Sequence, residues 1–327
     1  MRLLLTGLLF WWSVAATAEA PIAIAVHGGA GTITRDMMSS EQEAAYRAVM
    51  DQAVSSGYAA LEQGQLGIDV VVAVIKVLED SPLFNAGLGA VLTWEGHHEL
   101  DASIMSGEDL AAGAVAGVKS VKNPIEAARA VMLFSPHVLL AGEGADIFAG
   151  EHGLERVDNS YFTIPRRRDA LERYKSAHVA KPVDSKFGTV GVVVLDQEGN
   201  LAAGTSTGGM TGKRWGRVGD APLIGAGTFA DNGSCAVSAT GHGEYFIRWQ
   251  VASDICSRMK YTGVSLEQAT NEVIHDILVP AGGEGGVVAV DPQGNVAMVF
   301  NTEGMYRASI DARGVKTIGI YKNEELE

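Results

Sequence analysis

A Gly-Thr pair, Gly188 and Thr189, stands between a charged, aperiodic stretch and a strongly apolar one. The apolar stretch, residues 192–195, predicts a buried strand, while residues 179–187 predict an exposed link at which a chain can be cut. A cut between the two residues would give Thr189 a free α-amine beside its hydroxyl. A single residue would then supply both nucleophile and base.

Hydroxyl side chains lie among glycines in the segments that follow. Thr205, Thr207 and Thr211 belong to one glycine-rich stretch, and Thr240 stands directly before Gly241. Glycines expose backbone N–H groups, and such donors stabilise a developing oxyanion. These segments are therefore candidates for the surroundings of a threonine nucleophile.

Arg217 and Asp220 are a cation and an anion three residues apart in a glycine-rich loop. Together they match the carboxylate and the ammonium of a free amino acid, because arginine binds a carboxylate through two parallel hydrogen bonds. A surface salt bridge is the alternative, and from the pair alone it is the stronger one. The break-prone junction at Thr189 favours the ligand-binding interpretation.

Other patterns argue against other functions. The chain has 25 basic and 39 acidic residues, a net charge of −14, so nucleic acid is not an expected partner. The turn at residues 27–31 lacks the spacing of phosphate-binding loops, and His27 within it is typical of a buried core histidine. Adjacent His97 and His98 would point to opposite faces of a strand, which argues against joint metal ligation.

The first 20 residues have the features of a secretory signal. Arg2 precedes an apolar run over residues 3–14, and small residues, among them Ala18 and Ala20, offer cleavage sites. Export to a bacterial periplasm is therefore expected, with an uncleaved membrane anchor as the alternative. Only Cys235 and Cys256 are present, and we expect two free, buried thiols rather than a bridge.

Periodicity predicts helices over residues 40–63, 67–80, 123–134, 169–176, 243–261 and 265–278. Strands are expected over residues 22–26 and 111–118, and a hairpin over residues 90–103 that turns at Glu95-Gly96. Residues 192–202 and 287–297 share a strand, an Asp-x-x-Gly turn and a returning strand. The order of these elements favours antiparallel sheets covered by helices over a regular βαβ alternation.

Seven motifs in one order make the chain resemble the threonine-type isoaspartyl peptidase and plant-type L-asparaginase family of N-terminal-nucleophile (Ntn) hydrolases. They are HGGAG (27–31), FNAGLG (84–89), ELDA (99–102), GTVG (188–191), STGGMT (206–211), GRVGD (216–220) and ATGHGE (239–244). The resemblance covers nearly all of the chain after the signal. It implies an α+β fold, a four-layer αββα sandwich.

The resemblance also implies how the chain is divided. Residues 1–20 would be the signal peptide, residues 21–188 the large subunit and residues 189–327 the small subunit, separated by self-cleavage at Gly188-Thr189. Two such pairs would form an (αβ)₂ heterotetramer. Many relatives have a small, polar or His residue where this chain has Phe187, and this departure would alter the rate of cleavage.

Site roles follow from the same resemblance. Thr189 would be the nucleophile, Thr207 would hydrogen-bond it, Thr240 and Gly241 would form the oxyanion hole, and Asn85 would support this end of the site. Arg217 would hold the substrate α-carboxylate and Asp220 its α-amine, with Thr240, Gly241 and Gly243 lining the pocket. The reaction would release L-aspartate from β-aspartyl dipeptides and L-asparagine through a β-aspartyl ester on Thr189.

No cofactor for catalysis is implied, and no membrane partner for the mature form. A structural sodium ion would be bound by backbone carbonyls of one loop, those of Leu78, Glu79, Ser81, Phe84, Ala86 and Leu88.

Two alternatives stay open at this point. One is a glycosylasparaginase of the same fold, which needs room for a sugar beside the aspartyl group. The other is a secreted amino-acid-binding protein without catalysis, which would keep an intact chain. The joint presence of Thr189, Thr207 and Thr240 argues against the second, because binding alone needs none of them.

Overall fold

The computed structural model describes residues 20–178 and 188–324. The predicted signal segment, apart from Ala20, and the predicted link at residues 179–187 lie outside this described part. Within it, every helix is too short or too polar to cross a membrane.

An eight-stranded sheet forms the centre of the molecule, in the order β12-β11-β1-β5-β6-β2-β3-β4. Neighbouring strands are antiparallel except for β3 and β4. The strands are β1 (Ala23–Gly31), β2 (Leu100–Ser106), β3 (Ala112–Val118), β4 (Leu139–Ala141), β5 (Val190–Leu195), β6 (Leu201–Thr207), β11 (Gly304–Ile310) and β12 (Lys316–Tyr321).

A second, four-stranded antiparallel sheet packs against the first. Its order is β10-β9-β8-β7, with β7 (Thr228–Ala230), β8 (Ala236–Gly241), β9 (Gly285–Val290) and β10 (Val296–Phe300). Strands β8 and β9 face β1 and β5 of the large sheet, and β7 faces β2 and β6.

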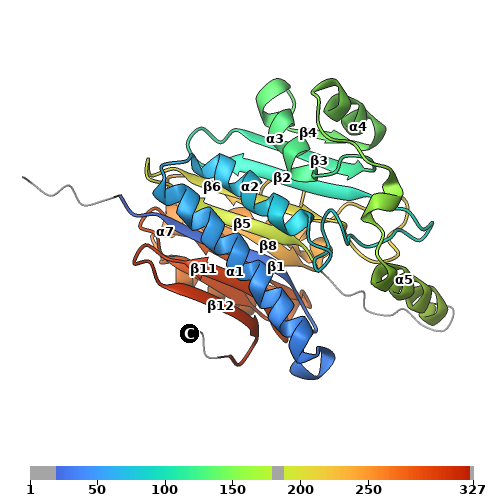
Figure 1. Cartoon of the computed structure of the whole chain (residues 1–327). Coiled ribbons are helices and arrows are strands. Elements are labelled where there is room, and N and C mark those ends of the chain that lie inside the picture. The colour runs from blue at the N-terminus through green and yellow to red at the C-terminus, as the bar shows by residue number, and fades with distance from the viewer. Residues whose placement is uncertain (1–19, 179–187, 325–327) are drawn as a thin grey trace, which may run out of the picture.

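Helices cover the outer face of each sheet. The large sheet carries α1 (Ser40–Glu62), α2 (Gly67–Glu79) and α3 (Pro124–Phe134), and the small sheet carries α7 (Val251–Thr262) and α8 (Leu266–Asn271). Figure 1 shows α1 and α2 lying across the large sheet, with α7 on the far side. The four-layer αββα architecture is therefore confirmed.

Shorter elements complete the fold. They are η1 (Arg35–Met37), α4 (Gly142–Glu151), η2 (Asn159–Phe162), α5 (Pro165–His178), α6 (Gly243–Trp249), the π-helical turn η3 (Glu272–Leu278) and α9 (Val279–Ala281).

Side chains that point alternately to the two faces of the central strands explain how the layers pack. In β1, Ile24 and Val26 point into the core beneath the helices, whereas Ala23 and Ala25 point into the layer between the sheets. Side chains alternate between the faces of a strand, so a strand with two buried faces is apolar throughout. Small residues on the inner face let the two sheets approach closely.

The repeated Asp-x-x-Gly turns are as predicted. Oδ1 of Asp196 accepts hydrogen bonds from the backbone N–H groups of Glu198 and Asn200, at 3.0 and 2.9 Å. Oδ1 of Asp291 accepts from Gln293 and Asn295 at the same distances, 3.0 and 2.9 Å. One carboxylate thus closes each turn between two antiparallel strands.

The single helix predicted over residues 243–261 is wrong, because the chain breaks into α6 and α7 at Gln250. This residue has a left-handed φ of 50°. The first N–H groups of α7, those of Ala252 and Ser253, donate instead to the carbonyls of Ala226 and Gly225. The break thus holds the loop that begins at Asp220 against the small sheet, a tertiary interaction that helical periodicity does not reveal.

The hairpin predicted over residues 90–103 is half right. The turn exists, since the Thr93 N–H donates to the His97 carbonyl at 2.8 Å, but only β2 follows as a strand. The Val91 N–H donates to the Asn85 side chain, and the Trp94 N–H donates to the Lys213 carbonyl. These hydrogen bonds to loops replace those of the expected first strand.

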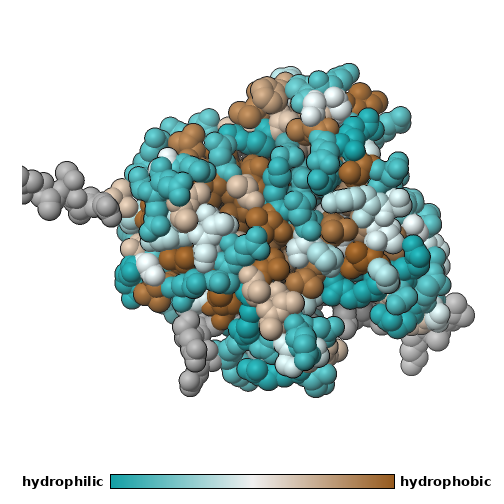
Figure 2. Space-filling model, viewed as in Figure 1, coloured by the Kyte–Doolittle hydropathy of each residue, from teal (hydrophilic) through white to brown (hydrophobic). Residues whose placement is uncertain are grey.

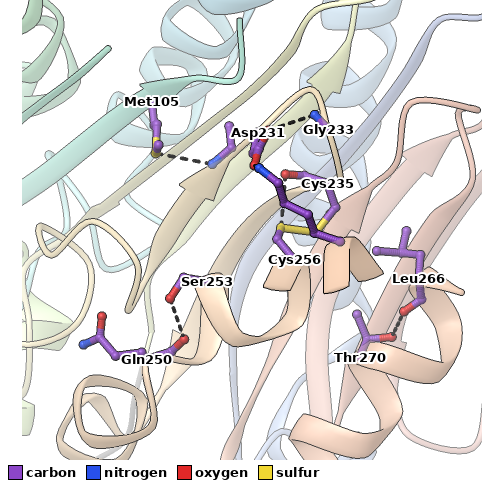
Figure 3. The surroundings of a disulfide bond; sticks show 11 residues. Met105, Asp231, Gly233, Cys235, Gln250, Ser253, Cys256, Leu266 and Thr270 are labelled. Carbon is purple, nitrogen blue, oxygen red and sulfur yellow. Dashed lines mark hydrogen bonds and ion pairs between the residues drawn. A yellow bond between two sulfur atoms is a disulfide. The ribbon is translucent and has the colours of Figure 1, made fainter. Parts of the chain in front are cut away.

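The expectation of two free thiols is wrong, although both cysteines are buried. Cys235 and Cys256 form a disulfide, with their Cα atoms 5.3 Å apart. Figure 3 shows the bond joining the start of β8 to α7. Helix α7 crosses the small sheet at this point, which brings the two Cα atoms within bridging distance. That crossing could not be read from a separation of 21 residues.

Apolar side chains are exposed at one end of the large sheet. Figure 2 shows hydrophobic surface over α3, β4 and α4. The side chains concerned are 41–63% exposed: Leu133, Phe134, Val138, Leu139 and Ile147. Grouped apolar side chains of this kind mark surfaces that associate with other molecules.

Candidate active site

Three strands bring the predicted site residues to the same end of the two sheets. Thr189 directly precedes β5, Thr207 is the last residue of β6, and Gly241 is the last residue of β8. Strands β5 and β6 are antiparallel neighbours, so the start of one lies beside the end of the other. Strand β8 packs against both from the small sheet.

The hydroxyls of Thr189 and Thr207 are joined by a hydrogen bond. Thr189 Oγ1 donates to Thr207 Oγ1 at 3.1 Å, and Thr207 Oγ1 in turn donates to the Gly188 carbonyl oxygen at 3.1 Å. The Gly209 N–H donates to Thr207 Oγ1 at 3.0 Å, which fixes the position of that oxygen. Thr207 therefore contacts both the hydroxyl and the carbonyl that a self-cleavage reaction would join.

Asn85 places a second donor on the same carbonyl. Its Nδ2 donates to Gly188 O and to Gly209 O, each at 2.7 Å, and its Oδ1 accepts from the Val91 N–H at 2.8 Å. The side-chain amide is thus fully used and held in place. Two donors on one carbonyl oxygen favour negative charge there.

His27 contacts the backbone carbonyl of Thr189. Its Nδ1 lies 3.0 Å from Thr189 O, and its Nε2 lies 3.0 Å from Ser238 Oγ. Burial lowers the pKa of His27 to about 3, against the opposing effect of its hydrogen bond to Thr189. The neutral ring must carry its proton on Nδ1, because a carbonyl only accepts, so Ser238 donates to Nε2. His27 is a satisfied buried histidine, and its contact with Thr189 was not predicted.

Arg217 and Asp220 lie together, but Arg217 is not paired with Asp220. Arg217 Nε and Nη2 donate to the two carboxylate oxygens of Glu244 at 2.9 and 3.0 Å. Sequence reasoning gave Glu244 no role. Its place in the ATGHGE motif, beside residues already proposed to bind substrate, was the available signal.

Asp220 is buried, and its Oδ2 has no hydrogen-bond partner in the described part of the chain. Burial raises the pKa of Asp220 to about 7. A Cβ atom on Gly243 would lie 2.9 Å from both Arg217 Nη2 and Asp220 Oδ1. Any side chain at position 243 would therefore collide with both groups, so close packing requires glycine there.

Thr240 and Gly241 form the end of β8 beside these groups. Thr240 Oγ1 accepts from the Ala30 N–H at 3.3 Å, which leaves its hydroxyl proton available for donation. Gly241 has a φ of 157°, and a Cβ there would lie 2.4 Å from the Glu284 carbonyl oxygen. Only glycine fits this close approach between the strands.

A small cavity connects these groups. Gly188, Thr189, Thr207, Arg217, Asp220 and Gly241 all line it, together with Gly209, Met210 and Gly219. Its volume is only about 10 Å³, the space of about one water molecule. With Gly188 still bonded to Thr189, the site is too small for an amino acid.

The loop proposed to bind sodium is tightly wound. The Leu88 N–H donates to the Glu79 carbonyl at 2.7 Å, which closes the loop. A Cβ on Gly89, whose φ is 99°, would lie 2.7 Å from the Pro82 carbonyl oxygen and 3.0 Å from that of Phe84. Of these carbonyls, those of Glu79 and Phe84 belong to the proposed sodium ligands, and the Glu79 carbonyl already accepts the hydrogen bond from Leu88. Backbone carbonyls are the kind of oxygen donor that suits a hard cation.

Comparison with known proteins adds independent information. A family model described as asparaginase matches residues 20–320. The isoaspartyl peptidase of Salmonella typhimurium is 52% identical, over 91% of this chain and 98% of the relative. The isoaspartyl peptidase of Escherichia coli is 51% identical, over 92% and 96%. The human isoaspartyl peptidase/L-asparaginase is 38% identical, over 90% and 94%.

Proposed function

The chain belongs to the asparaginase family, and we propose that it cuts itself at Gly188-Thr189 and then hydrolyses β-aspartyl dipeptides and L-asparagine. One observation carries the proposal: Thr207 hydrogen-bonds both the Thr189 hydroxyl and the Gly188 carbonyl. A nucleophile, the bond it attacks and a group that contacts both are thus assembled in the uncut chain.

Self-cleavage proceeds through an ester. Thr189 Oγ1 attacks the Gly188 carbonyl carbon, and the Gly188 C–N bond breaks as the Thr189 nitrogen takes up the hydroxyl proton. Asn85 Nδ2 and the Thr207 hydroxyl stabilise the oxyanion on Gly188 O. Water then hydrolyses the ester, leaving a carboxylate on Gly188 and a free amine on Thr189.

The mature site repeats this chemistry on a substrate. The Thr189 amine takes the proton from its own hydroxyl, whose oxygen attacks the side-chain carbonyl of the aspartyl group. Thr240 and Gly241 stabilise the oxyanion, the amine passes its proton to the leaving nitrogen, and water releases L-aspartate from Thr189. Thr207 holds the nucleophile throughout.

Arg217 and Asp220 select the aspartyl group. The N–H groups of Arg217 that are not used by Glu244 bind the α-carboxylate, and Asp220 receives the α-ammonium. The unpartnered Oδ2 of Asp220 supports this role, because a buried carboxylate without a donor gains most from a cationic ligand.

Two variants of Thr189 test self-cleavage. Thr189→Ala lacks the attacking oxygen and is expected to stay a single chain, whereas Thr189→Ser keeps the oxygen and is expected to yield two chains. Intact mass and N-terminal sequencing distinguish them, and two chains from Thr189→Ala would refute the proposal. Hydrolysis of β-aspartyl-leucine but not of N-glycosyl-asparagine would separate the proposed activity from that of a glycosylasparaginase.

A structural sodium ion belongs to the same proposal. The backbone carbonyls of Leu78, Glu79, Ser81, Phe84, Ala86 and Leu88 would bind it, and it would stabilise the loop that carries Asn85 without entering the reaction. Thermal unfolding in sodium, compared with that in a bulky organic cation, measures the effect. Equal unfolding temperatures in the two salts would argue against the ion.

Export and assembly complete the proposal. The apolar segment at residues 3–14 and the Cys235–Cys256 disulfide support an oxidising compartment, the bacterial periplasm. Cell fractionation and an N-terminus near Pro21 would establish export. The exposed apolar side chains on α3, β4 and α4 support association into an (αβ)₂ heterotetramer, and light scattering gives its mass.

A further inference from the structure

A second cavity shares lining residues with the small cavity at Thr189. Its volume is about 440 Å³, within the range of small-molecule sites, and Trp94, Tyr174, Arg214 and Trp215 line it. Met210 and Arg217 line both this cavity and the small one at Thr189. The two spaces therefore adjoin, and a substrate bound through Arg217 can extend from one into the other.

Arg214 provides an uncommitted positive charge in this cavity. Its guanidinium carbon lies 3.5 Å from the ring centroid of Trp94 and 5.8 Å from that of Trp215. Within residues 20–178 and 188–324, its side chain forms no hydrogen bond or ion pair, and its buried Nε has no partner. Its neighbours differ: Lys213 contacts Asp101 and the Glu99 carbonyl, and Arg217 contacts Glu244.

Trp215 stands out for its exposure. Its side chain is 93% exposed, and its φ of 57° lies in the left-handed region that non-glycine residues rarely adopt. Packing against residues 20–178 and 188–324 does not account for an exposed indole on a strained backbone. Strained residues cluster at ligand-binding sites. The indole lines the cavity and has most of its surface free to contact a bound molecule.

We propose that Arg214, with Trp94 and Trp215, forms a subsite for the residue released from a β-aspartyl dipeptide. Resting on the proposed function, this inference adds a determinant of substrate choice. The released residue carries its own carboxylate, which Arg214 binds, and a side chain, which the two indoles contact. Asparagine releases ammonia, which has neither group, so the subsite favours dipeptides over asparagine.

Arginine suits this role in two ways. Its flat face stacks on Trp94, while its edge keeps N–H groups directed away from the ring and able to bind a carboxylate through parallel hydrogen bonds. Stacking also orients the guanidinium before substrate arrives, which reduces the entropy lost on binding.

The test compares three substrates on the two-chain enzyme: β-aspartyl-leucine, its C-terminal amide and L-asparagine. The wild type is expected to favour the free dipeptide over the amide by about tenfold in kcat/KM, the effect of about one charge-assisted hydrogen-bonded pair. Arg214→Met keeps the apolar stem but not the charge. It is expected to abolish this preference and to lower the dipeptide-to-asparagine ratio of kcat/KM by a similar factor.

Arg214→Lys is the matched control and should retain part of the preference, because it keeps the charge without the planar hydrogen bonds. An unchanged dipeptide-to-amide ratio in Arg214→Met would overturn the proposal. An equal loss on all three substrates would also overturn it, by showing that Arg214 only supports the fold. If the wild type hydrolyses none of the three, the proposed function itself fails, a result distinct from either of these.

Discussion

Nδ1 of His27 lies 3.0 Å from the carbonyl oxygen of Thr189, although 162 residues separate the two in the chain. The contact joins β1 to the start of β5. A chain of buried hydroxyls continues from the other ring nitrogen, through Ser238 to Thr205 at 2.7 Å and on to Thr228. The backbone carbonyl of Thr189, the residue proposed as nucleophile, is thus bonded to a buried polar network between the sheets.

Replacing His27 by alanine removes this support. His27→Ala should lower the free energy of unfolding by about 2–4 kcal/mol, because it leaves a cavity and two buried polar groups without partners. Ser238→Ala removes a smaller group from the same network and should cost about 1–2 kcal/mol. Urea unfolding in the Thr189→Ala background, expected to remain uncut, measures both. Equal and small losses would contradict the proposed support.

One of the two hydrogen-bond donors to the Gly188 carbonyl, the Asn85 side-chain amide, can be removed with little change in side-chain shape. Asn85→Asp keeps the acceptor for the Val91 N–H but puts negative charge where the oxyanion would form. Self-cleavage should slow by about 10²–10³-fold, as followed by the appearance of two chains on a denaturing gel. Asn159→Asp is the matched control, because the Asn159 amide also donates to two backbone carbonyls, those of His98 and Lys119. Cleavage at the wild-type rate in Asn85→Asp would exclude the role.

Binding of the product should depend on pH through Asp220. Burial raises the pKa of its carboxyl to about 7, so the anion that pairs with a ligand ammonium is lost as the pH falls below that value. The affinity for L-aspartate, measured by calorimetry, should fall about tenfold per pH unit below the pKa. Asp220→Asn should bind weakly, with no such dependence. Constant affinity from about pH 5.5 to 8 would dismiss Asp220 as the ammonium ligand.

Glu79 links stability to pH in the opposite direction from an ordinary surface carboxylate. Its side chain is buried, and this burial raises its pKa from 4.5 to about 8. The folded state therefore binds this proton more tightly than the unfolded state, so stability is lost as the pH rises from about 4.5 to about 8. The side chain at position 79 in the Glu79→Gln variant cannot titrate. The free energy of unfolding of this variant should therefore exceed that of the wild type increasingly across that range, by on the order of a few kcal/mol at its upper end.

Urea unfolding at several pH values measures how the free energy of unfolding of each protein depends on pH. The matched control is Glu155→Gln, which makes the same Glu-to-Gln substitution at a surface ion pair with Lys122. Parallel stability curves for wild type and Glu79→Gln would contradict the assignment.

Alternation and helical spacing are local properties, so they predicted antiparallel sheets covered by helices. The four-layer αββα sandwich was predicted from the family resemblance. Sequence reasoning also named Thr189, Thr207, Arg217 and Asp220 from residue types and glycine spacing, although their roles stay predictions. What it missed depends on distant segments meeting. The contact of His27 with Thr189, the pairing of Cys235 with Cys256 and the break at Gln250 are all set by tertiary packing, for which short-range patterns carry no signal.

The order of the large sheet has a consequence for the proposed two-chain protein. Strands β5 and β6 would belong to the second chain, yet they lie between β1 and β2 of the first, while β1 itself lies between β11 and β5. The products would be interleaved within one hydrogen-bonded sheet. Dilution would not separate them, because parting would break ladders on both sides of β1. Both cysteines follow Thr189, so no disulfide would link the chains, and a denaturing gel would show two bands even without reductant.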